Sequence, residues 1–181
     1  VETVRTELQY SLQAKIVLKR EEHESLLHYY SCLSKWIHSI SNYSFAGITY
    51  DTINLIYERL KDINTCYSET ILAFSRVELL VDNDKLREEG HSLINEVLKY
   101  QERTVRTCGD YHLLCLEMHA EEVKLKDGGS VEEWAEVLAK HQIAMKEYYE
   151  EQASEYGSLL RHTIPHMNTI SSHLKFIIRD E

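Results

Sequence analysis

Glutamate, histidine and cysteine recur at helical spacing in the second half of the chain, and these residue types bind metal ions. Ten histidines are present among 181 residues. Glu88 and His91 have the i, i+3 spacing that di-iron helical bundles use. Such a site needs a second Glu-x-x-His and two further glutamates, and the sequence offers no matching pair. The spacing therefore favours a solvated helix face, and we expect no metal ion there.

A second cluster combines cysteine with histidine. His112, Cys115 and His119 stand at i, i+3 and i+7, so they share one helical face and could bind zinc if a fourth ligand arrived from elsewhere. The neighbouring positions leave that helix little polar surface, which favours ordinary half-buried residues: Leu113, Leu114, Leu116 and Met118. We therefore expect neither a metal nor a cofactor.

Support for nucleophilic catalysis is weaker. The segment "CGDYH", residues 108–112, contains a cysteine and a histidine but has no identifiable partner base on a pocket-forming strand. The chain has no GxSxG elbow, no phosphate-binding glycine loop and no HExxH motif. An elongated helical protein also offers few concave pockets that exclude water. The sequence thus predicts a protein that is not an enzyme.

Cysteine usage and hydropathy give an expectation for the compartment. The four cysteines form no CxxC pair, and the closest two, Cys108 and Cys115, stand two helical turns apart, where a disulfide is geometrically unfavourable. No run approaches the roughly 20 apolar residues that span a bilayer, and the first ten residues lack the zones of a signal peptide. We expect reduced thiols and a cytoplasmic protein.

The charge balance limits the partners. Lysine and arginine number 20 against 30 acidic residues, a net charge of -10, so a general nucleic-acid binder is excluded for want of a basic face. Short basic groups remain, and each charge near an anionic lipid surface contributes about 1 kcal/mol. The candidates for membrane contact are Lys15, Lys19, Arg20, Lys124 and Lys126. Simple solvation is the alternative for each of these groups.

Glycine and proline are scarce, with 6 and 1 residues, which predicts long helices. The first helix is predicted from residue 1 to about 40. A break follows it, and Thr49 or Asp51 is the candidate N-cap of the next helix. A second helical run is predicted over residues 52–125, with a kink or short interruption near 82–90, because no proline enforces a turn. The fold expected so far is all-α.

Paired glycines in "KDGGS", residues 126–130, predict a firm stop, and Ser130 with Glu133 forms a capping-box pattern for a third helix from about residue 131. Pro165 is expected to kink that helix. The predicted architecture is an elongated antiparallel three-helix bundle with a kinked middle helix, forming one domain over residues 1–181. The helices of such a chain have to pack side by side to bury their apolar stripes, and we expect them to pack against a second copy as well.

Large residues at helical spacing predict the surfaces that pack. Aromatic rings with their hydroxyl or indole group at the rim suit helix interfaces, and tryptophans often anchor them. The residues expected to form this core or dimer seam are Trp36, Trp134, Tyr149, Gln152, Tyr156 and Leu159.

Three stretches resemble a BAR domain of the sorting nexin type. One is the polar tip "KLKDGGSVEEW" at residues 124–134, and another is the segment of residues 95–125, which resembles the second half of the family's middle helix. The third is the last helix, where the family has a glutamine, an aromatic residue four positions on, paired leucines and a proline. The matching residues are Gln152, Tyr156, Leu159, Leu160 and Pro165.

The resemblance implies a crescent-shaped homodimer, or a heterodimer with a related BAR protein, that senses or tubulates curved endosomal membrane. It implies contact with anionic or phosphoinositide lipids and a cytoplasmic, peripheral location on endosomes. The acidity of the chain departs from the basic membrane-facing side of that family. Two alternatives stay open. "LSKWIHSI", residues 33–40, and "LREEGHSLINEVL", residues 86–98, resemble spectrin repeats, and a secreted helical cytokine would require an export signal and paired cysteines.

Overall fold

Apolar residues at helical spacing produce four long helices in residues 2–179, the range that the computed structural model describes. They are α1 (Glu2–Ser41), α2 (Asn54–Leu80), α3 (Asp84–Lys126) and α4 (Val131–Arg179), and a short 3-10 turn, η1 (Tyr50–Thr52), precedes α2. None of the described residues belongs to a β-strand. The all-α class predicted from the sequence is confirmed.

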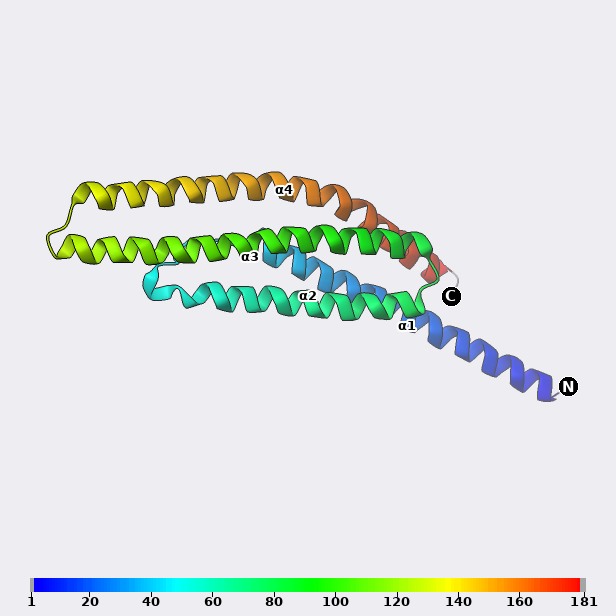
Figure 1. Ribbon diagram of the computed structural model, residues 1–181. Coiled ribbons are helices and arrows are strands. Elements are labelled where there is room, and N and C mark those ends of the chain that lie inside the picture. The colour runs from blue at the N-terminus through cyan, green and yellow to red at the C-terminus, as the bar shows by residue number, and fades with distance from the viewer. Residues whose placement is uncertain (1, 180–181) are drawn as a thin grey trace.

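The helices run alternately in opposite directions and lie lengthwise beside one another, which gives the elongated shape seen in Figure 1. Along the chain, α1 packs mainly against α2, and α3 mainly against α4. Contact between α1 and α4 is less extensive. The protein is therefore two helical hairpins placed side by side, and the contact of α1 with α4 is the most extensive one between the two hairpins.

The middle of the chain differs from the sequence expectation. A single kinked helix was predicted over residues 52–125, but Val81 takes an extended conformation, α2 ends, and α3 returns antiparallel beside it. The turn is held by side chains. Asn83 accepts a hydrogen bond from the backbone N–H of Leu86 at 3.0 Å as the N-cap of α3, and Arg87 donates to the Val81 carbonyl at 2.8 Å. Four helices thus replace the expected three.

The other boundaries follow the predicted signals. Gly128 has a φ of 93°, which L side chains rarely adopt, and the N–H of Gly129 closes the end of α3 on the Lys124 carbonyl at 2.9 Å. Ser130 then accepts from the N–H of Glu133 at 3.3 Å at the start of α4. Helix α4 continues through Pro165, and its C-terminal part runs at an angle to the rest (Figure 1).

One cluster of buried side chains draws on all four helices and on the α1–α2 connection. In α1 it contains a stripe of residues with no exposed surface, and burying each large apolar side chain contributes about 1.5–3 kcal/mol. These are Leu26, Tyr29, Leu33, Trp36 and Ile40. The stripe begins only at Leu26, and residues 9–24 of α1 lie outside this core.

Candidate functional site

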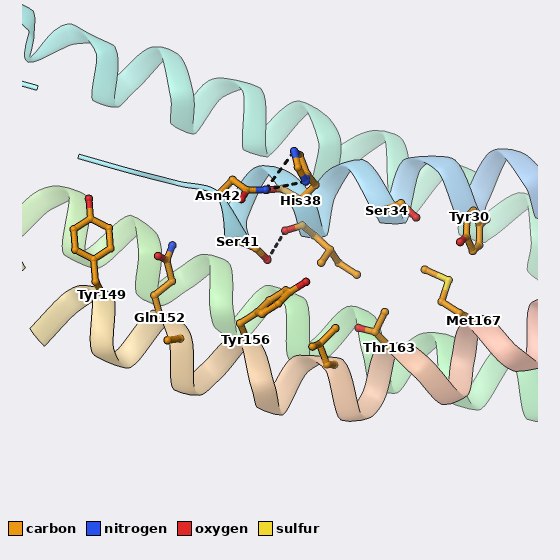
Figure 2. A pocket seen from close by; sticks show the side chains of 13 residues that line it. Tyr30, Ser34, His38, Ser41, Asn42, Tyr149, Gln152, Tyr156, Thr163 and Met167 are labelled. Atoms are coloured by element: carbon orange, nitrogen blue, oxygen red, sulfur yellow. Dashed lines mark hydrogen bonds between the residues drawn. The ribbon is translucent and has the colours of Figure 1, made fainter. Parts of the chain in front are cut away.

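A groove between α1 and α4, with a volume of about 500 Å³, is a surface feature that a partner could enter. Figure 2 shows Gln152 and Tyr156 of α4 pointing across it toward α1. Six lining residues come from α1 and the residue after it, and seven come from α4: Tyr30, Ser34, Ile37, His38, Ser41, Asn42, Tyr149, Gln152, Ala153, Tyr156, Leu160, Thr163 and Met167.

The composition of this groove is unlike that of the chain as a whole. Aspartate, glutamate, lysine and arginine make up 28% of the sequence, yet none of them lines the groove. Three tyrosines and a methionine do. The centre of a protein interface is depleted in charged residues and enriched in aromatic residues and methionine, relative to the remaining surface. The groove therefore has the character of a protein-binding surface.

Local hydrogen bonds satisfy several polar groups of the groove. The Ser41 hydroxyl donates to the Ile37 carbonyl at 2.8 Å, and the Asn42 side-chain nitrogen lies 2.8 Å from Nδ1 of His38. A partner would not have to replace these bonds, because they are made within α1 and its C-terminal end. Polar atoms in the groove thus add little to the cost of covering it.

Contacts at both ends fix how α1 and α4 face each other. At one end Gln152 donates to the Tyr43 carbonyl at 3.1 Å, and the Tyr149 hydroxyl accepts from the N–H of Phe45 at 3.2 Å. At the other end the Tyr29 hydroxyl lies 3.0 Å from Nε2 of His166. These contacts fix the spacing between α1 and α4, which form the two walls. The groove between them is therefore part of the fold.

Helix α1 also has an exposed N-terminal arm, which we define as residues 9–20. It extends past the other helices in Figure 1. All of residues 9–18 are exposed, including five large apolar side chains with exposed fractions of 52–69%. They are Tyr10, Leu12, Ile16, Val17 and Leu18. Contiguous exposed apolar residues of this kind mark interaction sites.

The basic residues predicted to contact membrane do not form one surface. Lys15, Lys19 and Arg20 lie on the N-terminal arm, whereas Lys124 and Lys126 lie at the far end of the molecule, by the α3–α4 turn (Figure 1). Arg20 pairs with Glu24 at 2.9 Å, and Lys124 pairs with Glu121 at 2.5 Å. Within one chain, the five cations therefore form two separate groups.

The predicted seam residues also divide between different places. Trp36 and Leu159 are buried in the core, while Tyr149, Gln152 and Tyr156 line the groove. Trp134 is half-buried in the first turn of α4, away from the groove residues. Sequence reasoning did not single out the polar and small groove residues Ser34, Ser41, Asn42 and Ala153. Heptad spacing was an available signal for two of them, since Ser34 precedes Ser41 by seven residues.

The three residues of the cysteine–histidine cluster contact different neighbours. His112 lies 3.4 Å from the Tyr57 hydroxyl, Cys115 is buried, and the ring of His119 stacks on Tyr50 with centroids 3.7 Å apart. Among residues 2–179, no group of three or more histidine, cysteine, aspartate or glutamate side chains is placed to hold a metal ion.

Thiol chemistry has little support at neutral pH. The described cysteines are free, and three of the four are buried: Cys32, Cys108 and Cys115. Burial raises the pKa of the Cys108 thiol to about 11, so the nucleophilic thiolate is scarce at that position of "CGDYH". The histidine of the same segment, His112, lies 3.4 Å from the Tyr57 hydroxyl.

A buried histidine gives the fold a pH dependence. His166 has no exposed surface, and burial lowers its pKa to about 4, against an opposing effect of Glu89. An unfolded histidine has a pKa near 6.5. Between these values the unfolded chain binds a proton that the folded chain does not. The stability contributed by neutral His166 is therefore complete above pH 6.5 and is lost as the pH falls toward 4.

We expect the free energy of unfolding to fall by on the order of 3 kcal/mol across this range through His166 alone. A His166→Gln variant should lose less stability between pH 6.5 and 4 than the original chain, measured by urea unfolding at a series of pH values. His162→Gln changes an exposed histidine of the same helix and should keep the original pH profile. Equal profiles for all three proteins would contradict the assignment.

None of the described helices combines the length and the apolar composition needed to cross a bilayer. Comparisons with family models, with curated proteins and with solved structures find no match to this chain. The interpretation of the groove and the arm therefore depends on their own geometry and chemistry.

Proposed function

We propose that the protein is a non-enzymatic helical scaffold that works as a dimer, either with itself or with a related chain. The observation that carries this proposal is the uncharged, tyrosine-rich groove between α1 and α4, together with the exposed apolar arm of α1. Both are surfaces of the kind that protein partners cover. The dimer is also what the resemblance to sorting nexin BAR domains implies, although the four-helix order differs from the three-helix plan expected with it.

The mass of the protein in solution tests this proposal. Light scattering at several concentrations should give twice the chain mass of 21.3 kDa, and small-angle scattering should give an elongated particle. A monomer at all concentrations up to the micromolar range would contradict self-association. The proposal would then be limited to a dimer with a related helical chain, and co-purification as a one-to-one complex would test it.

The finer proposal is that this scaffold acts on membranes, in endosomal trafficking and in the sensing or tubulation of curved membrane. Its support is the resemblance and one local feature of the arm: between Leu8 and Arg20 the sequence has three basic residues and no acidic one. The α3–α4 tip is a weaker candidate, because Glu121 and Asp127 accompany Lys124 and Lys126 there. An anionic or phosphoinositide-containing surface is the lipid partner that fits the arm.

Sedimentation with vesicles tests the membrane role. At low salt the protein should bind vesicles that contain phosphatidylserine or a phosphoinositide, and Lys15→Glu with Lys19→Glu should reduce binding by about tenfold or more, given about 1 kcal/mol for each charge removed. Lys124→Glu with Lys126→Glu is the matched control and should have a smaller effect. No binding to any anionic vesicle would favour the alternative of a spectrin-like spacer or protein-interaction module.

A further inference from the structure

The N-terminal arm and the groove lie on the same helix and share its packing rows. Counting in steps of seven from Leu12 leads through Lys19 to Leu26, Leu33 and Ile40 of the core, and counting from Ile16 leads through His23 to Tyr30 and Ile37 of the groove. Residues seven apart stay on one side of a helix in bundles and coiled coils. Leu12 and Ile16 therefore continue the side of α1 that borders the groove.

The wall that α4 contributes has the same period. Tyr149, Tyr156 and Thr163 form one row at seven-residue spacing, and Ala153, Leu160 and Met167 form another. A surface of two such rows beside a parallel or antiparallel neighbour accepts a further helix by side-chain interdigitation. The groove thus has the geometry for one more helix lying along α1 and α4.

The arm has the properties of a helix that enters such a groove. Of its twelve residues three are charged, Lys15, Lys19 and Arg20, and the last two stand at its C-terminal end. With 100° between successive residues, Leu12 and Ile16 lie on one side, and Tyr10, Val17 and Leu18 lie on another. A helix lying on a membrane has one apolar side opposite a strongly charged one, whereas a helix that packs between others is apolar over a broad arc. The arm fits the second description better.

We propose that the arm of each copy lies in the α1–α4 groove of a second copy, antiparallel to that copy's α1. This inference rests on the dimer proposed above and names its interface. The arm spans 12 residues and the α1 wall runs from Tyr30 to Asn42, so both measure roughly 20 Å at 1.5 Å per residue. A two-fold arrangement covers the side of both arms that bears Leu12 and Ile16, and both grooves, at once.

The arrangement has a defined register. A crossing centred at the level of residues 23–27 places residues 10–18 of one copy opposite residues 40–32 of the other. The contacts of Tyr29 with His166 and of Tyr43 with Gln152 place Leu160 about level with Ser34 on the groove walls. Ile16 of one copy should therefore lie beside Leu160 of the other.

Two charge substitutions test this contact. Ile16→Glu puts a carboxylate on the arm, and Leu160→Lys puts an ammonium group in the groove. Each variant alone has two unfavourable contacts in its own homodimer, and its dimer dissociation constant should rise at least about tenfold, as for truncation of a central interface residue. An equimolar mixture should recover dimer, because the mixed pair has one original contact and one Glu–Lys contact. Analytical ultracentrifugation measures all three samples.

The matched control is Leu79→Glu on α2, which places the same charge at a leucine that is 85% exposed and belongs to neither surface. It should leave the dissociation constant unchanged. Circular dichroism confirms that each variant is folded. If Leu160→Lys lowers the melting temperature, Ala153→Arg, at an exposed groove position, replaces it as a single variant and should also weaken the dimer.

The outcomes separate this inference from the proposed function. A monomeric original chain overturns this inference and leaves, of the proposed function, the dimer with a related chain. A dimer unaffected by Ile16→Glu and by Leu160→Lys, or weakened by both but not recovered on mixing, keeps the dimer and overturns the contact between arm and groove. If Ile16→Glu abolishes vesicle binding and leaves the dimer intact, the arm's partner is the membrane and the inference is overturned as well.

Discussion

Trp36→Ala should lower the free energy of unfolding by about 3–5 kcal/mol, the loss expected when a large buried aromatic side chain is truncated. Trp36 has no exposed surface, and its ring lies 5.2 Å from that of Tyr67 on α2. Its indole N–H donates to Oε1 of Gln101 on α3 at 2.7 Å. The side chain therefore links α1 to both α2 and α3, and its loss should be a large part of total stability.

The indole hydrogen bond can be separated from the packing. Trp36→Phe keeps much of the apolar volume but removes the donor to Gln101, which is itself buried and donates onward to Asn64 at 2.9 Å. Leaving that carbonyl oxygen without a partner costs about 1–3 kcal/mol. Urea unfolding should rank the original chain first, Trp36→Phe second and Trp36→Ala last.

Trp134 provides the matched control, because it is the other tryptophan of the chain and is only half-buried in the first turn of α4. Trp134→Ala should cost about 1 kcal/mol or less. Equal losses for the two alanine variants would show that the helices do not pack around Trp36 as described.

Gly90→Ala should destabilise the protein by about 1–3 kcal/mol, although alanine is the better helix former by about 1 kcal/mol. A Cβ atom at Gly90 would lie 2.5 Å from Cζ of Phe74 and 3.3 Å from Cε1 of His166. Phe74 cannot move aside without loss, because it is buried and its ring packs against Tyr29 at 4.9 Å. The glycine is what allows α3 to approach α2 and α4 closely at this level.

Gly109 is the control for this substitution. It lies in the same helix, and a Cβ there would have no neighbour within 4 Å, so Gly109→Ala should stabilise the protein by up to about 1 kcal/mol. The two substitutions are chemically identical and should have opposite signs in thermal or urea unfolding. Stabilisation by both would mean that α2, α3 and α4 do not meet at Gly90. Phe74→Leu should partly relieve the loss in a double variant with Gly90→Ala.

Signals read from neighbouring residues predicted several features correctly. The glycines at 128 and 129 end α3, and Ser130 caps α4. The helical spacing of apolar residues predicted the all-α class and nearly the correct ends of α1. These features depend on backbone conformations and hydrogen bonds within a few residues of one another, which is why a single sequence is enough to predict them.

The reversal between α2 and α3 was missed, because apolar spacing is the same on both sides of a turn. Residues 81–83 contain neither glycine nor proline, and Asp82 and Asn83, which favour a helix N-cap, fit a short interruption as well as a reversal. The turn depends instead on contacts across the bundle: Val81 is buried, and Asn83 reaches Nδ1 of His173 on α4 at 3.2 Å. The antiparallel direction of α3 is thus decided by packing.

The sequence by itself determined that the chain is helical, where most helices begin and end, and which residues face a neighbour at all, because these follow from local hydrogen bonding and apolar spacing. Only the tertiary structure decided which neighbour each residue faces. Trp36 and Tyr156 were predicted to share one seam, yet the first is sealed in the core and the second borders an open groove. The physical reason is that an apolar stripe determines only that a helix surface is packed. The arrangement of all four helices determines which neighbour that surface packs against.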